Sequence, residues 1–346
     1  MPPGGWVETD VHSENPATKR RFKNLLERSG LMKHLVSIEP RYATVEEIML
    51  YHGEAYIQKV KQISEIGHGD AGMHALVGKG SYEIALLAAG GALKAVESVV
   101  RGEVNNVYAL IRPPGHHAEA NQGIGFCLFN NVAIAAKYAR KELGIGKIMI
   151  IDWDVHHGNG TEAAFYDDPN VLFVSLHQER NFPSGRGRAE EVGAGDGIGY
   201  NINIPLPAGT GNAGYMYALK EIVGPVADQF KPEFVIISAG QDASMFDPLA
   251  RMMVTSEGYR QMTRFVLEIA DRHCGGKLVA CHEGGYSAAY VPFCSLAIVE
   301  EMCGRRSGVE DPFAPALSDA PTDELYDIQK EYVEKVKKIH SAYWKF

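Results

Sequence analysis

Five short apolar runs recur along this chain, and they constrain its fold more than any other feature of the sequence. Each run is rich in Val and Ile without polar alternation, which is typical of strands buried on both faces of a parallel sheet. The runs lie at residues 106–111, 147–152, 171–176, 234–239 and 277–281. Longer helix-like segments lie around them, at residues 82–100, 130–143, 215–230 and 257–273. This alternation predicts a doubly wound α/β sheet.

The sequence shows no boundary between domains. It has no long Ser/Gly/Pro linker and no internal repeat, so we interpret residues 1–346 as one domain, with an N-terminal loop and helix region at 1–50. Residues 184–199 are rich in Gly, which predicts a loop. Residues 322–340 are charged and amphipathic, and they predict a C-terminal helix with Thr322 as its N-cap.

Polar side chains follow all five predicted strands at the point where each strand ends. They are His116 and His117; Asp154, His156 and Asn159; Ser175 and His177; Asp242; and Glu283 and Tyr286. In open α/β sheets, ligands bind outside the carboxyl ends of the strands. Loop polarity alone gives one or two such coincidences, but not readily five. We therefore expect a functional site at this edge of the sheet.

Composition narrows the functional class. The 346 residues are 45% hydrophobic and 22% charged, as in globular proteins and unlike disordered chains or coiled coils. A net charge of −9 argues against a general binder of nucleic acid or of anionic membranes. No apolar run has the length of about 18 residues that a membrane span needs, and residues 1–6 show no secretory signal. Five scattered cysteines without a C-x-x-C pair favour a reducing, cytoplasmic setting.

The segment after the second strand offers ligands for a metal. Side chains at i and i+2 of an extended segment share a face, so Asp152, Asp154 and His156 point the same way. Carboxylates with an imidazole suit zinc or another divalent metal, and a catalytic zinc site needs three protein ligands and one open position. Asp242, at the end of another strand, is a natural third ligand. The competing interpretations are an acidic loop that caps the next helix and, for Asp242, a helix N-cap.

His116 and His117 follow Pro-Pro-Gly and suit an acid/base pair better than two ligands of one metal. One imidazole can remove a proton from an attacking water, and the other can donate a proton to a leaving group. Each imidazole needs an acceptor behind it to fix its tautomer, and Asp152 and Asn159 are candidates for that position. A solvated turn is the alternative interpretation.

Tyr286 follows the last predicted strand in the sequence Glu-Gly-Gly-Tyr. The two glycines allow close backbone approach, and a tyrosine hydroxyl there can donate to an oxyanion, although a merely packed tyrosine is the alternative. Phe126 and Phe182 can line a narrow hydrophobic channel or simply pack in the core. The chain has no Walker A motif, no Gly-x-Ser-x-Gly elbow and no complete dinucleotide fingerprint.

Taken together, these residues resemble the histone deacetylase superfamily, on the arginase/deacetylase fold. The matching stretches are RPPGHHAE (112–119), GFCLFNNVAIAA (125–136), IDWDVHHGNGT (151–161), VLFVSLHQ (171–178), ISAGQDASMFDPL (237–249) and EGGYS (283–287). Six motifs in the family's order are highly specific. The resemblance implies a three-layer α/β/α fold with a mainly parallel central sheet. Asn159, where class I members tend to carry Asp, points to the class II-like branch, which includes bacterial histone deacetylase-like amidohydrolases.

The resemblance implies a role for each candidate residue. It makes Asp154, His156 and Asp242 the ligands of one zinc ion per chain, His116 and His117 the acid/base pair, Asp152 and Asn159 their partners, and Tyr286 the carbonyl-polarising group. It lines a substrate channel with Gly125, Phe126, Phe182, Leu249 and Gly284. The family also holds structural potassium. One ion would use Asp152, Asp154, His156, Ser175 and Leu176, partly through backbone oxygens, and a second would use Phe165, Asp168, Val171 and Tyr200.

The implied reaction is hydrolysis of an acyl amide to a carboxylate and an amine. Acyl-lysine or a small acyl amide is the expected substrate, and acetylpolyamines and xenobiotic amides are alternatives. Polyamine-selective relatives place Glu where this chain has Leu249, which weakens the polyamine interpretation. Gln241, usually Phe in this branch, and Ser244, usually His, also depart from the family pattern beside Asp242. Formation of a homo-oligomer and the division of roles between the two histidines stay open.

Two other functional classes compete with this interpretation. A two-metal ureohydrolase on the same fold would need further carboxylate ligands and would leave His116, His117 and Tyr286 unexplained. Counting metal ions per chain separates the two classes. A non-catalytic module that binds acyl-lysine or a small ligand is disfavoured because all six proposed zinc and catalytic residues are present, and an activity assay tests it.

Overall fold

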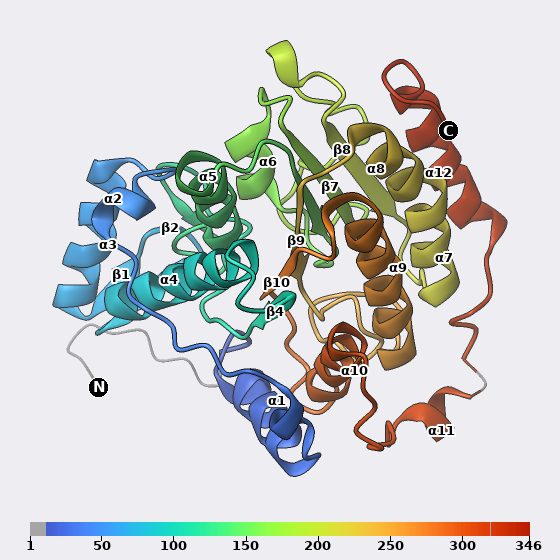
Figure 1. The fold of residues 1–346 in the computed structure, drawn as a ribbon, viewed down its shortest axis with the longest axis horizontal. Coiled ribbons are helices and arrows are strands. Elements are labelled where there is room, and N and C mark those ends of the chain that lie inside the picture. The colour runs from blue at the N-terminus through green and yellow to red at the C-terminus, as the bar shows by residue number, and fades with distance from the viewer. Residues whose placement is uncertain (1–11, 319) are drawn as a thin grey trace.

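A six-stranded sheet lies at the centre of the computed structural model, which describes residues 12–318 and 320–346 (Figure 1). The strand order is β4-β10-β9-β6-β7-β8, and every pairing in this sheet is parallel. The strands are β4 (Asn106–Ala109), β6 (Ile148–Asp152), β7 (Val171–Gln178), β8 (Asn201–Leu206), β9 (Phe234–Ala239) and β10 (Leu278–His282). Residues 1–6, where no secretory signal is expected, lie outside the described range.

Helices cover both faces of this sheet, which confirms the expected three-layer α/β/α architecture. One face packs against α4 (Ser81–Val100), α5 (Asn131–Leu143) and α6 (Asn159–Phe165). The other packs against α7 (Asn212–Ala218), a π turn at Leu219–Val223, α8 (Gly224–Phe230), α9 (Ser256–Cys274), α10 (Val291–Cys303) and α12 (Asp327–His340). Figure 1 shows α4 and α5 on one side of the strands and α8, α9 and α12 on the other.

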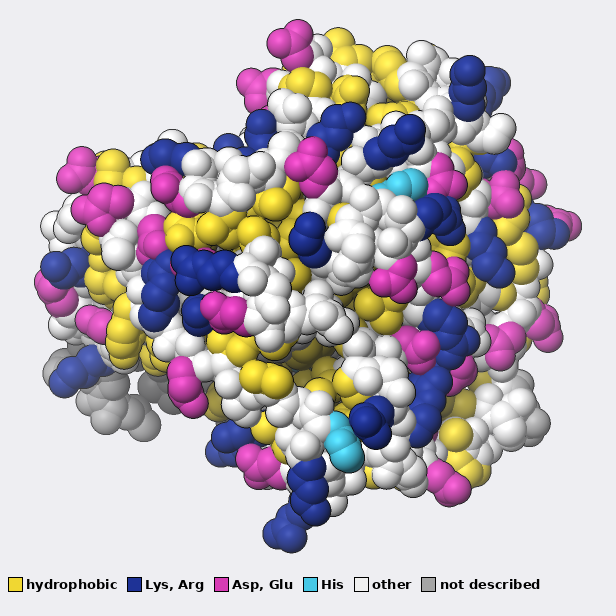
Figure 2. All heavy atoms as spheres, viewed as in Figure 1, with side chains coloured by type: hydrophobic (Ala, Val, Ile, Leu, Met, Phe, Trp, Pro, Cys, Tyr) yellow, Lys and Arg dark blue, Asp and Glu magenta, His cyan; other side chains and the backbone are white. Residues whose placement is uncertain are grey.

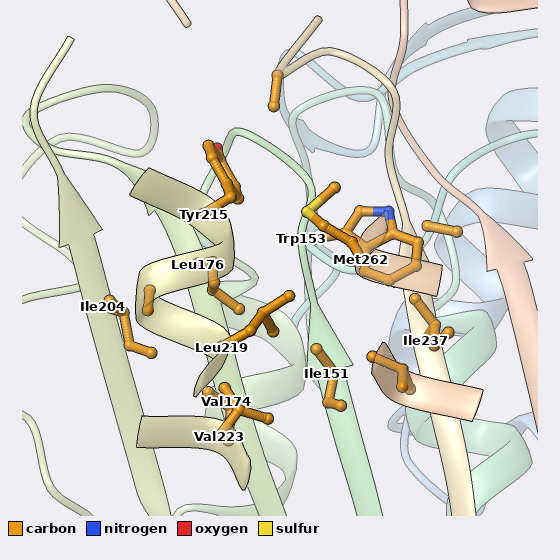
Figure 3. Packing of buried hydrophobic residues seen from close by; sticks show 14 of the residues in the cluster. Ile151, Trp153, Val174, Leu176, Ile204, Tyr215, Leu219, Val223, Ile237 and Met262 are labelled. Atoms are coloured by element: carbon orange, nitrogen blue, oxygen red, sulfur yellow. The ribbon is translucent and has the colours of Figure 1, made fainter. Parts of the chain in front are cut away.

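The core forms because successive side chains of a strand point to opposite faces. In β6, Met149 and Ile151 pack beneath α7 to α9, while Ile148 and Ile150 pack beneath α4 and α5. Figure 3 shows Ile151 among side chains from neighbouring strands and from the helices that cover them. Both faces of the central sheet are therefore buried beneath helices, which explains why the strand sequences are continuously apolar.

Two strands differ from the prediction. β4 ends at Ala109, two residues earlier than expected, and it is a half-buried edge strand. β8 was missed because its sequence alternates Asn with Ile and contains Pro205. Ile202 and Ile204 enter the core, whereas Asn201 and Asn203 face the other way and donate to the Glu162 carboxylate of α6. As the outermost strand, β8 also tolerates proline.

The C-terminal helix begins later than predicted, and Thr322 as its N-cap is wrong. α12 starts at Asp327, after Tyr326 in extended conformation. The carbonyl of Thr322 accepts a hydrogen bond from the backbone N–H of Ala213 at 3.1 Å, so this segment is held at the start of α7 and is not free to open a helix. The predicted helix at 215–230 is one helical stretch interrupted by the π turn.

The N-terminal part adds short elements beside this scaffold. They are α1 (Ala17–Arg28), a 3-10 turn (Leu31–His34), α2 (Val45–Ile48), α3 (Glu54–Ile66), β1 (His68–Asp70), β2 (Gly72–Met73), β3 (Leu76–Gly78) and β5 (Gly123–Ile124). A 3-10 turn (Gly195–Gly197) and α11 (Ala314–Leu317) complete the structure. Among the described residues, no helix combines the length and the apolar character that crossing a membrane requires.

Candidate active site

Two carboxylates and an imidazole meet where β6 and β9 end. Asp154 and His156 follow β6, and Asp242 follows β9, its hydrogen-bonded neighbour. One ligand atom from each residue lies within 4.8 Å of the other two. His156 Nδ1 is 3.1 Å from an oxygen of Asp154 and 3.1 Å from an oxygen of Asp242. All three residues are buried. The structure thus brings together the three predicted metal ligands.

Backbone N–H groups hold the two carboxylates in place. Gly284 N–H donates to Asp154 Oδ2 at 2.8 Å, and Val155 N–H donates to Asp242 Oδ1 at 2.8 Å. Gly284 must be glycine for steric reasons, because a Cβ there would lie 2.2 Å from Asp242 Oδ2 and 2.6 Å from Asp154 Oδ2. The segment after β10 therefore packs directly against both aspartates with the backbone of Gly284, without a side chain between them.

The charges in this cluster favour a bound cation. Burial and the nearby charge of Asp154 raise the pKa of Asp242 to about 6. Burial would lower the pKa of His156, but the two carboxylates outweigh it and raise that pKa to about 10. Two carboxylates packed this closely in a buried site repel each other, and a divalent cation offsets that repulsion. The donor set, two carboxylate oxygens and one imidazole nitrogen, fits zinc.

The adjacent histidines have different partners. His116 Nδ1 lies 3.0 Å from Asp152 Oδ2, and His117 Nδ1 lies 2.8 Å from Asn159 Oδ1. Burial lowers the pKa of His116, but the Asp154 and Asp152 charges outweigh it and raise that pKa to about 10. Burial, with the charges of neighbouring histidines, holds the pKa of His117 well below its usual value. Environments that push two pKa values apart are typical of an acid and a base.

Tyr286 and two phenylalanines surround these groups. The ring of Tyr286 lies 6.4 Å from that of His156 and 5.9 Å from that of Phe126, between centroids. Phe182 stacks edge-on against His117 at 5.1 Å. Gly125 also approaches His117 and Phe182 closely. These predicted channel residues therefore lie together around the metal candidates.

Two buried carboxylates support the site, although the sequence analysis gave them no role. Glu283 accepts from the N–H groups of Gly115 and His116, at 2.6 and 3.2 Å, and so holds the turn that carries the histidine pair. Asp247 accepts from Tyr286 N–H at 2.8 Å and from Leu249 N–H at 2.9 Å. Leu249 is thereby tied to the Tyr286 backbone. Both acids lie inside recognised motifs, which was the available signal.

His177, the second-last residue of β7, does not join the cluster. Its Nδ1 faces the Ser175 hydroxyl at 2.9 Å, and its Nε2 donates to the Gly187 carbonyl at 2.8 Å. Both ring nitrogens are therefore occupied, and the bond from Nε2 holds the 184–199 loop against β7. Four of the five strand ends, rather than all five, supply the residues around the metal candidates.

The two departures from the family pattern lie behind Asp242. Gln241 is buried, and its amide donates to the Ala239 carbonyl at 2.6 Å and to the Tyr108 hydroxyl at 3.3 Å. Ser244 is buried as well, and its N–H donates to the Gln241 carbonyl at 3.3 Å. Both residues thus pack the loop that carries Asp242.

Two further sets of residues were predicted to hold potassium. In the first, Asp152 pairs in register with Ser175 across β6 and β7. In the second, the Asp168 carboxylate forms an ion pair with Arg140, so a cation bound to that carboxylate would compete with Arg140.

Comparisons with known proteins point to a single family. The histone deacetylase domain family matches residues 12–302. A histone deacetylase-like amidohydrolase from Pseudomonas aeruginosa is 44% identical over 340 residues, covering 97% of this chain and 90% of the relative. A probable deacetylase from Archaeoglobus fulgidus is 41% identical over 346 residues, covering 96% of each chain. The crystal structure of the HDA15 HD domain has a TM-score of 0.89 at 33% identity and covers 98% of this chain and 90% of that one.

The close approach at Gly284 gives a test of the metal cluster. Gly284→Ala places a methyl group against both aspartates, so we expect metal retention to weaken by about 10–100-fold, the scale of damage to the surroundings of metal ligands. Gly78→Ala is the matched control, because its Cβ would meet nothing closer than 3.8 Å. Metal content by elemental analysis and folding by circular dichroism are measured. A folded Gly284→Ala protein with full metal content contradicts the assignment.

Proposed function

This chain belongs to the histone deacetylase family and is an amide hydrolase of the deacetylase type, and we propose that it works with one zinc ion held by Asp154, His156 and Asp242. The observation that carries the proposal is the buried Asp-His-Asp cluster beside two histidines with unlike partners. Zinc held there lowers the pKa of a bound water and polarises an amide carbonyl.

The chain's own residues supply the proton transfers. His117, whose pKa is held low, accepts the proton of the attacking water at Nε2, since its Nδ1 faces Asn159. His116, paired with the Asp152 carboxylate, donates a proton to the departing amine. Tyr286 donates its hydroxyl to the carbonyl oxygen as negative charge develops there. Burial and the Asp242 charge raise the pKa of Tyr286 well above its usual value, so the hydroxyl keeps its proton.

The shape and charge of the channel favour an acyl-lysine or a small neutral acyl amide as substrate. Phe126, Phe182 and Leu249 offer apolar walls, which bury a methylene stem or a neutral acyl group. Asp247 behind Leu249 is only 7% exposed and already accepts two backbone hydrogen bonds, so it presents no open acidic gate to a polyamine. On the face seen in Figure 2, Lys and Arg are interspersed with Asp and Glu rather than separated into one strongly acidic field.

The proposal also includes a structural potassium ion and a location in a reducing compartment. A potassium ion near Asp152 would share that carboxylate with His116 and use Ser175 and Leu176. The buried Ser238 hydroxyl, opposite Asp152 in the register of β9, has no hydrogen-bond partner among the residues that the structure describes, and it suits a nearby cation. All five cysteines are free thiols, in keeping with a reducing, cytoplasmic setting.

The first test of this function counts the metal. We expect one zinc per chain, and Asp242→Ala should lose zinc and amidase activity together, because it removes one of three ligands. Glu233→Ala, far from the cluster beside Gly146, is the control and should keep both. Elemental analysis and hydrolysis of a fluorogenic acyl-lysine are measured in parallel. Two metal ions per chain would favour the ureohydrolase alternative, and full activity of Asp242→Ala would refute the ligand set.

The second test concerns the hydroxyl of Tyr286. Tyr286→Phe should lower kcat by roughly 10²-fold or more, the scale of one lost oxyanion donor, and leave Tm nearly unchanged. Tyr326→Phe, at an exposed tyrosine on the entry to α12, should leave both quantities unchanged. Near-wild-type kcat on unactivated amides would remove Tyr286 from the mechanism.

The third test compares substrate classes. We expect higher kcat/KM on acyl-lysine or small neutral amides than on acetylspermidine or acetylputrescine, because a dication gains little from apolar walls. All substrates are compared at one salt concentration and again at high salt, since attraction by surface charge is screened. A preference for acetylpolyamines that survives high salt would show a cation site elsewhere in the channel.

A further inference from the structure

A chain of hydrogen bonds runs from the surface to His117. His117 Nδ1 lies 2.8 Å from Asn159 Oδ1, and Asn159 Nδ2 donates to Glu119 Oε1 at 3.0 Å. Asn159 is 1% exposed, whereas the Glu119 side chain is 20% exposed. The same oxygen of Glu119 accepts from Arg186 at 3.3 Å. Glu119 thus stands between a surface arginine and the amide that orients a histidine of the active site.

This arrangement allows only one orientation of the Asn159 amide. Its Nδ2 has two acceptors in reach, Glu119 Oε1 and the His117 carbonyl oxygen at 3.2 Å. If the amide were flipped, its oxygen would face these two acceptors and gain no hydrogen bond from either. An ionised carboxylate accepts only, so Glu119 cannot adapt to the flipped amide.

The orientation of the amide decides the tautomer of His117. With Oδ1 facing the ring, His117 Nδ1 must carry the proton, and Nε2 keeps its lone pair. A flipped amide would present N–H to Nδ1, which would move the ring proton to Nε2 and remove the proton acceptor. A carboxylate at position 159 would need no such control, because both of its oxygens accept.

We propose that Glu119 is a positioning residue that fixes the Asn159 amide and thereby holds His117 in the tautomer that accepts a proton at Nε2. The inference rests on the proposed function, in which His117 is that acceptor. Arg186 and Gln122, which donates to Glu119 Oε2 at 3.4 Å, steady the carboxylate from outside.

The experiment begins with an isosteric change. Glu119→Gln should lower kcat by about 10–100-fold, the usual cost of losing a group that orients such a side chain, with KM, zinc content and Tm close to wild type. Glu191→Gln is the matched control. Its carboxylate is 18% exposed, pairs with Arg188 in the same way, and makes no hydrogen bond to Asn159, so kcat should not change.

A second background separates positioning from a structural role. In Asn159→Asp the side chain cannot flip into a donor, so adding Glu119→Gln there should cost no further kcat. If Glu119 had only a structural role, Glu119→Gln would lower kcat equally in both backgrounds, and that result would overturn the proposal. An unchanged kcat in the wild-type background would overturn it as well.

The tautomer is also read directly. Nitrogen-15 NMR of the imidazoles should show His117 protonated at Nδ1 in the wild type, with Nε2–H gaining population in Glu119→Gln. An unchanged His117 tautomer would overturn the proposal whatever the activity. Failure of the proposed function would give a different result. His117→Ala would then keep the kcat of the wild type, while Glu119→Gln in the protein that keeps His117 would still change the tautomer of that histidine.

Discussion

The parallel register of β6 and β9 is the constraint on which the site depends. It sets Asp152 opposite Ser238, so that the chain leaving each strand starts at the same edge of the sheet. Asp154 and Asp242, which are 88 residues apart in sequence, then lie within reach of one imidazole nitrogen. A slip of one residue would turn the side chains of the strand to the opposite face and separate the carboxylates. The Ile and Met side chains of β6, which pack in the core on both faces of the sheet, prevent that slip.

Burying these charges is costly unless each is paired or hydrogen-bonded. The structure meets this cost mainly with backbone N–H groups, which need no further ordering once the strands are formed. Asp154, Asp242 and Glu283 each accept from such a group near a strand end. The fold and the site are therefore stabilised by the same strand ends, and a cation bound at the candidate ligands would complete the balance of charge.

Much of the fold could be predicted from sequence because buried parallel strands are continuous apolar runs and their carboxyl ends carry the site. The predictions that were wrong or incomplete concern residues whose roles depend on contacts with residues distant in sequence. The sequence of β8 is half polar, and only the structure shows that Asn201 and Asn203 donate to the buried Glu162 carboxylate. Thr322 has the residue type of a helix N-cap, but its carbonyl accepts a hydrogen bond from the start of α7. The role of Glu283 arises from hydrogen bonds across 168 residues, which no local pattern contains.

The two histidines are neighbours in sequence with ring centroids 4.0 Å apart, so their difference must come from elsewhere. It comes from the turn that runs from the end of β6 to the start of α6, which supplies Asp152 to one ring and Asn159 to the other. For both contacts to form, the histidine turn and this turn must touch. At Gly160 a Cβ would lie 2.2 Å from the Ala118 carbonyl oxygen, so only glycine allows that approach. One turn therefore provides two candidate metal ligands and both histidine partners, and it gives the two neighbours of a single dipeptide unlike surroundings.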